Sequence, residues 1–331
     1  MAVKSAVIYH GDCDGVISAG LYIRHFLLDY FPDKILLKYS HPWRLHEDLD
    51  RIIKILKEGI EVIVLLDLAI SLQIVELLKN ISKIKGLTVV VVDHHLSSAP
   101  IVDTLRNLQL NVKVFWKQVQ STPEVLASHL IRNLNEYEQA LVRVASVCEG
   151  GYAEDEHIRD VADKIKLVLA VEPNNEALIK GSVEAIVKGI EFWNSKEYNE
   201  KYSKAKWLLQ TLLRRIEERI EKVCNWGIAA FNAAESMIYA GLFGIASTEF
   251  IKKFKIPMLL IREEEKKIVV TARSVDGKAL EFCKAFASEY KEELNAIYGG
   301  HKEAASLTIR ASKTLPELVQ LVKEFIQKRY C

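Results

Sequence analysis

The sequence lacks the features of a membrane or secreted protein. Its most apolar segments, residues 62–70 and 87–92, are much shorter than the roughly 20 residues that a membrane helix needs, and acidic residues interrupt or end them. The short apolar run near the N-terminus reaches His10 and Asp12 at once, which leaves no room for the apolar core of a signal peptide. We therefore expect no membrane span and a cytoplasmic location.

Cysteine is sparse and has no regular spacing. The five cysteines are Cys13, Cys148, Cys224, Cys283 and Cys331, and no two of them form a CxxC pair. An odd number of scattered cysteines is typical neither of a disulfide framework nor of a structural zinc site. The spacing predicts reduced thiols.

An excess of charge of one sign is also missing. The chain has 45 Lys and Arg residues against 44 Asp and Glu residues. Because no general positive field surrounds such a protein, a nucleic-acid partner would have to be held by a local cleft or by bound metal cations. The sequence contains no internal repeat and no low-complexity tract, and its 331 residues predict about two folded domains.

The order of the predicted elements favours an α/β protein. Short β-rich runs at residues 6–9, 35–38, 62–66, 89–92 and 112–115 alternate with helical patterns. Apolar strands that are joined by helices predict a doubly wound parallel sheet over residues 1–150. Residues 151–225 have hardly any strand signal and are expected to form a helical connector. Strand patterns return in residues 226–331, which predict a smaller α+β domain.

Acidic residues and histidines follow three of the predicted strands directly. They are His10, Asp12 and Asp14 after the first strand, Asp67 after the third, and Asp93, His94 and His95 after the fourth. In an open parallel sheet the carboxyl ends of the strands border one crevice, so we expect these side chains to converge. Carboxylates crowded together need counter-charge, which divalent cations supply. A mixed imidazole and carboxylate set suits Mn²⁺ or a similar borderline ion, and the number of ligands is enough for two cations.

Each of these residues also has an ordinary structural explanation when it is taken alone. An Asp after a strand is often the N-cap of the next helix, which applies to Asp67. Asp12 and Asp14 could belong to an Asp-Gly turn, and residues 93–95 could form a solvated loop. The recurrence of the pattern at three strand ends favours a shared functional site.

A second candidate site lies near the C-terminus. Gly299 and Gly300 would let the backbone approach an anion closely, and His301 and Lys302 add hydrogen-bond donors. A Gly-Gly-His run is often only a turn. A strand pattern nearby ends at Arg273 and Ser274. We therefore favour contact of the Gly-Gly-His run and these two residues with a phosphate.

These runs together resemble the DHH phosphoesterase superfamily, in the branch that has a DHH-associated C-terminal domain. The resemblance is carried by HGDCDG at residues 10–15, Asp67, the triplet at residues 93–95, and YGGHKEAA at residues 298–305. It implies a two-metal phosphoesterase, with a metal-binding catalytic domain in residues 1–150 and a substrate-binding domain in residues 226–331. Members include RecJ-like exonucleases, nucleases of short oligonucleotides and phosphatases of nucleotide by-products.

The resemblance also implies a ligand set for each metal. His10, Asp12 and Asp67 would bind one cation, and Asp14, Asp67 and His94 would bind the other. Asp67 would then be the bridging ligand.

Roles for the remaining site residues are implied in the same way. Asp93 would orient its neighbours, and His95 would face the phosphate or the leaving oxygen. The family usually has one further Asp at the end of a helix near the close of the first domain. Here Glu149 is the candidate replacement, with Asp155 as a poorer alternative because its spacing fits less well.

We predict from the sequence a two-metal exonuclease of the RecJ-like class that acts on single-stranded DNA or RNA. Mn²⁺ is the expected cofactor, with Mg²⁺ and Co²⁺ as alternatives. One alternative function is a phosphatase or nuclease for short oligonucleotides or nucleotide bisphosphates. The other is a partner of replication or repair proteins, of the kind that associates with the GINS complex and has reduced activity.

Overall fold

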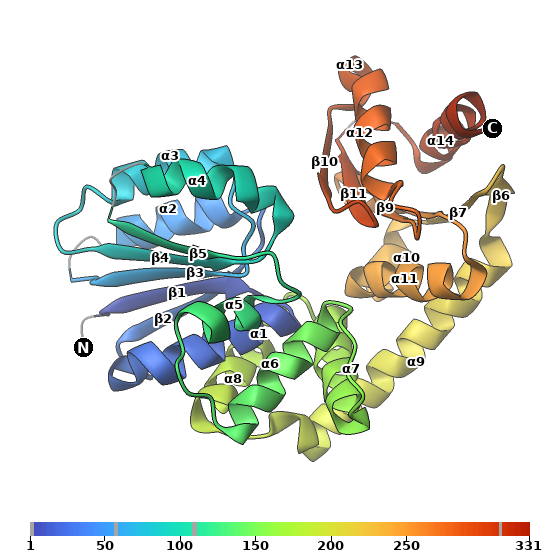
Figure 1. Cartoon of the computed structure of the whole chain (residues 1–331). Helices are drawn as coiled ribbons and strands as arrows, with labels where there is room; N and C mark the ends of the chain where they lie inside the picture. Colours follow the sequence, from blue (N-terminus) through green and yellow to red (C-terminus); the bar gives the residue numbers. More distant parts are fainter. Residues whose placement is uncertain (1–2, 56–58, 108–110, 311–312) are drawn as a thin grey trace. The chain divides into compact units, whose positions relative to one another are not determined.

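The computed structural model describes residues 3–55, 59–107, 111–310 and 313–331 (Figure 1). The chain forms two compact units, Met1–Tyr202 and Ser203–Cys331. No helix in the described ranges is long and apolar enough to cross a membrane.

The first unit is built on a five-stranded parallel sheet, as the sequence predicts. Its strands are β1 (Ser5–His10), β2 (Ile35–Ser40), β3 (Val62–Leu66), β4 (Thr88–Asp93) and β5 (Val112–Trp116). They lie in the order β2-β1-β3-β4-β5, and every neighbouring pair is parallel. Alternate side chains enter two cores: Val7 and Tyr9 of β1 belong to one, and Ala6 and Ile8 to the other. The sheet is therefore covered on both faces, which explains why its strands are almost uninterrupted apolar runs.

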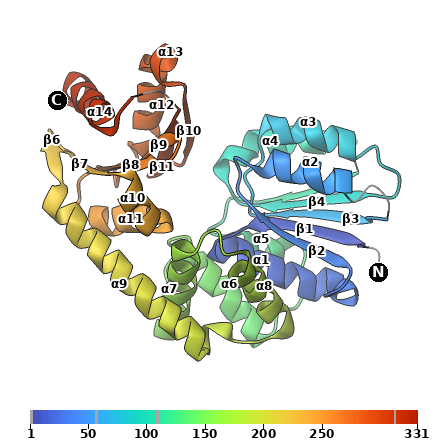
Figure 2. The ribbon, with the colours of Figure 1, turned by 180° about the vertical axis from the view of Figure 1, so that it is seen from behind.

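Helices cover the two faces of this sheet in unequal numbers (Figures 1 and 2). One face carries α2 (Leu45–Ile55), α3 (Leu72–Ile81) and α4 (Ala99–Asn107). The other carries α1 (Cys13–Tyr22), α5 (Thr122–His129), α6 (Glu136–Cys148), α7 (Glu156–Val171) and α8 (Glu176–Lys188). Buried residues of α7 and α8, such as Ile165 and Val183, lie in the same core as Val16 of α1. The helices that follow residue 150 thus pack on the first unit, and α9 (Lys196–Arg219) continues from them into the second.

The second unit has a six-stranded mixed sheet in the order β10-β11-β9-β8-β7-β6. Its strands are β6 (Glu221–Val223), β7 (Trp226–Phe231), β8 (Met258–Glu264), β9 (Lys267–Arg273), β10 (Ala296–Gly300) and β11 (Ala304–Ile309). Its helices are α10 (Ala233–Ile238), α11 (Phe243–Phe254), α12 (Ala279–Glu289), α13 (Lys291–Leu294) and α14 (Leu315–Tyr330). The α+β prediction is confirmed, but the glycines expected in a loop end β10, which pairs with β11 in an antiparallel hairpin.

The prediction of reduced thiols is wrong for four of the five cysteines. Cys13 is bonded to Cys148 and Cys224 to Cys331, across 135 and 107 residues of sequence. Among the described residues, which include all five cysteines, Cys283 has no disulfide partner and is buried. Spacing along the chain could not reveal these pairs because the fold alone brings such distant residues together.

Candidate metal centre

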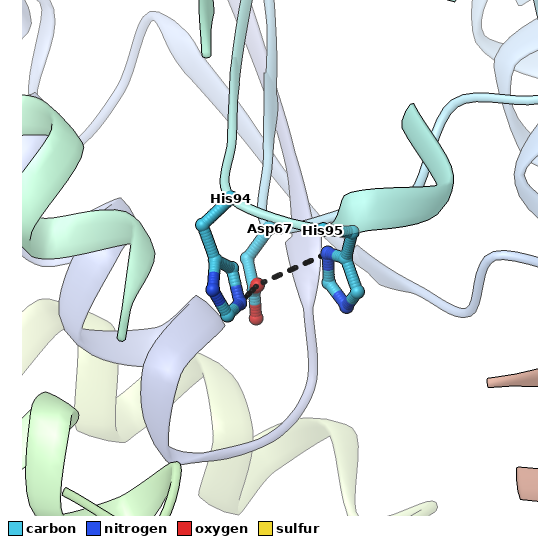
Figure 3. A group of neighbouring side chains, drawn as sticks. All are labelled: Asp67, His94 and His95. Atoms are coloured by element: carbon cyan, nitrogen blue, oxygen red, sulfur yellow. Dashed lines mark ion pairs between the residues drawn. The ribbon is translucent and has the colours of Figure 1, made fainter. Parts of the chain in front are cut away.

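The carboxyl ends of β1, β3 and β4 deliver the predicted ligands to one edge of the first sheet. These three strands are consecutive in the sheet, so His10, Asp67 and the residues after Asp93 lie next to one another. Figure 3 shows Asp67, His94 and His95 with their side chains directed toward one another. The convergence follows from the parallel topology, since all three strands end at the same edge.

The turn from β1 into α1 positions the first ligands. Asp12 is the N-cap of α1, and its Oδ1 accepts a hydrogen bond of 3.0 Å from the Gly15 amide. A Cβ atom at Gly15 would lie 2.1 Å from the His10 carbonyl oxygen, so only glycine fits there. The tight turn places the side chains of His10 and Asp12 against each other, with 2.8 Å between His10 Nδ1 and Asp12 Oδ2.

Two groups of potential metal ligands share Asp67. One consists of His10, Asp12 and Asp67, and the other of Asp67, His94 and His95; within each group the ligand atoms lie within 4.8 Å of one another. The two oxygens of Asp67 face different groups. Oδ2 is 3.6 Å from His10 Nδ1, whereas Oδ1 is 3.4 Å from His94 Nε2 and 3.9 Å from His95 Nδ1. A carboxylate with one oxygen on each side is suited to bridge two cations.

The position of Asp67 depends on its backbone and on Thr122. Asp67 has a φ of 58°, in the left-handed region that Asp adopts more readily than most residues. Its amide donates to the Val92 carbonyl at 3.0 Å, and the Thr122 hydroxyl donates to its Oδ1 at 3.1 Å. The sequence analysis missed Thr122, because the start of a helix at that position does not reveal which carboxylates it meets.

Asp14 lies directly behind these groups and is fully buried. Its Oδ2 accepts the Thr122 amide at 3.0 Å and lies 3.5 Å from His94 Nε2, and its Oδ1 accepts the Ser18 hydroxyl at 3.2 Å. Burial and the negative charges of Asp67 and nearby carboxylates raise the pKa of Asp14 well above its ordinary value. Because neighbouring carboxylates contribute to this shift together with burial, bound cations would stabilise the ionised form.

Asp93 holds His95 instead of facing the two ligand groups. Its Oδ1 lies 2.6 Å from His95 Nδ1, while its Oδ2 accepts the hydroxyl of Ser98, which itself accepts the Ile70 amide at 2.9 Å. Burial lowers the pKa of His95, but the hydrogen bond and charge of Asp93 outweigh it and raise the pKa to about 9. The Trp116 indole donates to the His95 carbonyl at 2.9 Å and fixes the backbone as well.

Glu149 caps the C-terminal end of α6. Desolvation and the negative charges of Asp12 and Asp67 raise the pKa of its carboxyl to about 7, so it is close enough to experience the charge of the centre. In the described part of the chain it belongs to neither ligand group. The alternative, Asp155, caps α7 by accepting the His157 amide at 2.9 Å.

The donor set fits divalent cations that bind both nitrogen and oxygen. Imidazoles and carboxylates stand together in each group, a combination that suits Mn²⁺ and similar borderline ions better than it suits Ca²⁺.

The residues predicted to bind substrate all lie at one edge of the second sheet. They are Arg273 and Ser274 at the end of β9, Gly299 and Gly300 at the end of β10, and His301 and Lys302 in the turn to β11. In this hairpin Gly300 has a φ of 130°, and its added Cβ atom would lie 2.4 Å from the Ala304 carbonyl oxygen. The His301 amide donates to the same carbonyl at 2.7 Å, which closes the turn.

Arg273 and Ser274 differ in what they offer a ligand. The half-buried Arg273 donates through Nε to Thr248 Oγ1 at 3.3 Å and through Nη1 to the Ala272 carbonyl at 3.0 Å. Among the described residues no carboxylate pairs with it, and burial lowers its pKa. Ser274 is fully buried and hydrogen-bonds to Asp276 and to the Lys278 amide, so it stabilises the turn after β9.

Each of the two units matches a family model. Residues 4–148 match the model of the DHH family, N-terminal domain, and residues 230–328 match that of the DHHA1 domain. No curated protein matches the sequence significantly.

Similar solved structures share the fold over nearly the whole chain. A DHH-domain protein described as a member of a family of ribosomal proteins has 17% identity and a TM-score of 0.70, covering 98% of this chain and 87% of that one. An exonuclease RecJ bound to manganese has 16% identity and a TM-score of 0.60, with coverage of 99% and 91%. The pGpG-specific phosphodiesterase PggH of Vibrio cholerae has 12% identity and a TM-score of 0.59, with coverage of 98% and 99%.

Proposed function

This chain belongs to the DHH phosphoesterase superfamily, and we propose that it hydrolyses phosphodiesters of nucleic acids with the help of two divalent cations. The observation that carries the proposal is the position of Asp67 between the two ligand groups, with one carboxylate oxygen toward each.

We assign the residues as follows. His10, Asp12 and Asp67 would hold one cation. Asp14, Asp67 and His94 would hold the other, since Asp14 Oδ2 and Asp67 Oδ1 lie 3.5 and 3.4 Å from His94 Nε2. Such cations lower the pKa of an attacking water and stabilise the charge of the phosphate. Mn²⁺ fits the mixed donor set, and Mg²⁺ and Co²⁺ are the alternatives to test.

His95 and Asp93 have a supporting task in this proposal. Because Asp93 engages Nδ1 of His95 at 2.6 Å, it fixes the orientation of the imidazole ring. A proton on Nε2 of the same ring is then the one that would pass to the leaving oxygen. Asp93 itself is bonded to His95 and Ser98 and therefore acts as a positioning residue.

Single-stranded DNA or RNA is the proposed substrate, cleaved from an end. Support comes from Arg273, a half-buried guanidinium that forms no ion pair with any described carboxylate and stands at the same end of the sheet as the exposed Gly299–Gly300 pair, with β11 between them. A terminal phosphate would supply the missing counter-charge. Dinucleotides are the second candidate, because the relative that is specific for pGpG matches over nearly all of both chains.

The test is incubation with end-labelled single-stranded DNA, RNA and dinucleotides in Mn²⁺, Mg²⁺ or Co²⁺, followed by separation of the products. We expect stepwise release of mononucleotides from the longer substrates, and no cleavage by the Asp67→Asn variant. Rapid cleavage of dinucleotides alone would favour the second candidate. Absence of hydrolysis with every substrate and metal would overturn the proposed activity.

A further inference from the structure

An exposed tryptophan stands next to the metal centre. Strand β2 lies beside β1, and the loop after it carries His41 and Trp43. The ring of His41 lies 5.7 Å from that of His10, edge to face, and the Trp43 ring is stacked on His41 at 5.7 Å between centroids and 7° between planes. Trp43 is nevertheless 66% exposed. The rings of His10, His41 and Trp43 thus form a continuous series from the candidate metal centre to the surface.

The loop that carries Trp43 is anchored by one buried carboxylate. Asp48 of α2 is 2% exposed and accepts the Ser40 hydroxyl at 2.8 Å. It also accepts Nε and Nη2 of Arg44 at 2.9 and 3.2 Å, and the Arg44 amide donates to the His41 carbonyl at 2.9 Å. Both ends of the loop are therefore tied to the same side chain. The exposed Trp43 indole is therefore carried by a loop whose backbone is held in place by hydrogen bonds.

We propose that Trp43, supported by His41, is a stacking platform for a nucleobase of the substrate. Large aromatic side chains generally bury much of their surface, and an exposed indole in an anchored loop beside a catalytic centre has the features of a binding group. A nucleobase presents a π-face to such a ring whatever its identity, so the contact would select nucleic acid over other phosphodiesters without selecting a base sequence. This inference rests on the proposed function and adds to it the part of the substrate that is recognised.

The site calls for a substrate whose base lies close to the scissile phosphate. His41 is in contact with His10, and His10 is assigned to one of the cations, so the platform and the phosphate would lie at the adjacent carboxyl ends of β1 and β2. A dinucleotide or the last nucleotides of a single strand meet this requirement. A base within a duplex would first have to break its base pair and unstack from its neighbours before it could bind to Trp43.

The decisive experiment compares a dinucleotide with an analogue in which one base is replaced by hydrogen. Trp43→Ala should lower kcat/KM for the dinucleotide by about 5- to 150-fold, the range expected for the loss of one stacked base. It should change kcat/KM for the abasic analogue much less, and Trp43→Phe should restore most of the activity. Trp207→Ala is the matched control, because Trp207 is 59% exposed on α9. Equal losses on both substrates would overturn the platform.

A binding measurement without turnover separates this inference from the proposed function. In the presence of EDTA, a dinucleotide should quench part of the tryptophan fluorescence of the native protein and of Trp207→Phe, but not of Trp43→Phe. Quenching that persists in Trp43→Phe would overturn the platform even if hydrolysis is observed. Mn²⁺ affinity should be the same in Trp43→Ala and the native protein, and a parallel fall in that affinity would show that Trp43 only supports the centre.

Discussion

Cys13 is bonded to Cys148, and this disulfide joins the first turn of α1 to the last turn of α6 beside the candidate metal centre. Cys13 stands between Asp12 and Asp14, and Cys148 precedes Glu149. The bridge therefore connects the segment that supplies the first carboxylates to the residue considered as an additional ligand.

Loss of this bridge should destabilise the protein. The Cys148→Ser variant should lose about 2–5 kcal/mol of unfolding free energy, because the bridge closes a long loop in the unfolded chain. Urea unfolding measures this loss, and reductant should lower the unfolding free energy of the native protein further, because it opens the Cys224–Cys331 bridge as well. Alkylation of unreduced, unfolded protein should modify Cys283 alone. Modification of all five cysteines would contradict the pairing.

Asp67 should be needed for both cations and Glu149 for at most one. Asp67→Asn should weaken both Mn²⁺ sites and lower kcat by more than the roughly 10- to 100-fold that follows the loss of a supporting residue. Glu149→Gln should weaken at most one site, because the carboxyl experiences the charges of Asp12 and Asp67 but belongs to neither ligand group. Isothermal calorimetry with Mn²⁺ measures both effects. Two unchanged sites in Asp67→Asn would refute its bridging role.

Gly15 and Gly181 form a matched pair for testing the turn between β1 and α1. Gly15→Ala should disrupt the centre, since its Cβ atom would lie 2.1 Å from the His10 carbonyl oxygen. An added Cβ atom at Gly181 in α8 meets nothing within 4 Å, so Gly181→Ala should stabilise the helix by about 0.5–1 kcal/mol. Thermal unfolding and Mn²⁺ binding distinguish them. A Gly15→Ala variant with native Mn²⁺ affinity would show that the turn can relax.

The pair of Arg24 and Glu138 should make stability depend on pH in the acid range. Burial favours the neutral carboxyl, but the hydrogen bond from Arg24 Nε at 2.9 Å and that from the Asn135 amide hold the pKa of Glu138 below its ordinary value. A depressed pKa in the folded state gives stability that is present above the unfolded value, about 4.3, and is lost as the pH falls through the folded value.

Glu138→Gln is the variant that tests this dependence. It should cost about 3 kcal/mol at pH 7, because Arg24 keeps its charge in a largely buried position without its carboxylate partner. It should also flatten the stability profile below about pH 4.3. Urea unfolding between pH 3 and pH 7 provides the measurement. An unchanged slope in the variant would assign the acid sensitivity to other carboxylates.

Substitutions in the second unit should weaken substrate binding and leave metal binding in the first unit unchanged. Arg273→Gln and His301→Ala should each lower kcat/KM for oligonucleotides by about 10- to 150-fold, the equivalent of losing a hydrogen bond to a charged phosphate. Mn²⁺ affinity and turnover of bis-p-nitrophenyl phosphate, which has no second phosphate, should change little. Equal losses on both substrates would assign these residues to folding instead.

The convergence of the main candidate ligands could be predicted from the sequence. The β-rich runs before His10, Asp67 and Asp93 are local signals, and the alternation of strands with helices predicts a parallel sheet. In such a sheet the ends of neighbouring strands lie together, so the convergence of these residues follows from topology.

Contacts between distant segments were decided by the tertiary structure. Thr122 bonds to Asp14 and Asp67 because α5 packs beside α1, and Cys13 reaches Cys148 for a similar reason. The sequence around Trp43 has no pattern that distinguishes an exposed ring from a buried one. Periodicity reports the face on which a side chain lies within its own element. What that face meets is determined only when separate elements pack, because the packing energy depends on residues far away in the chain.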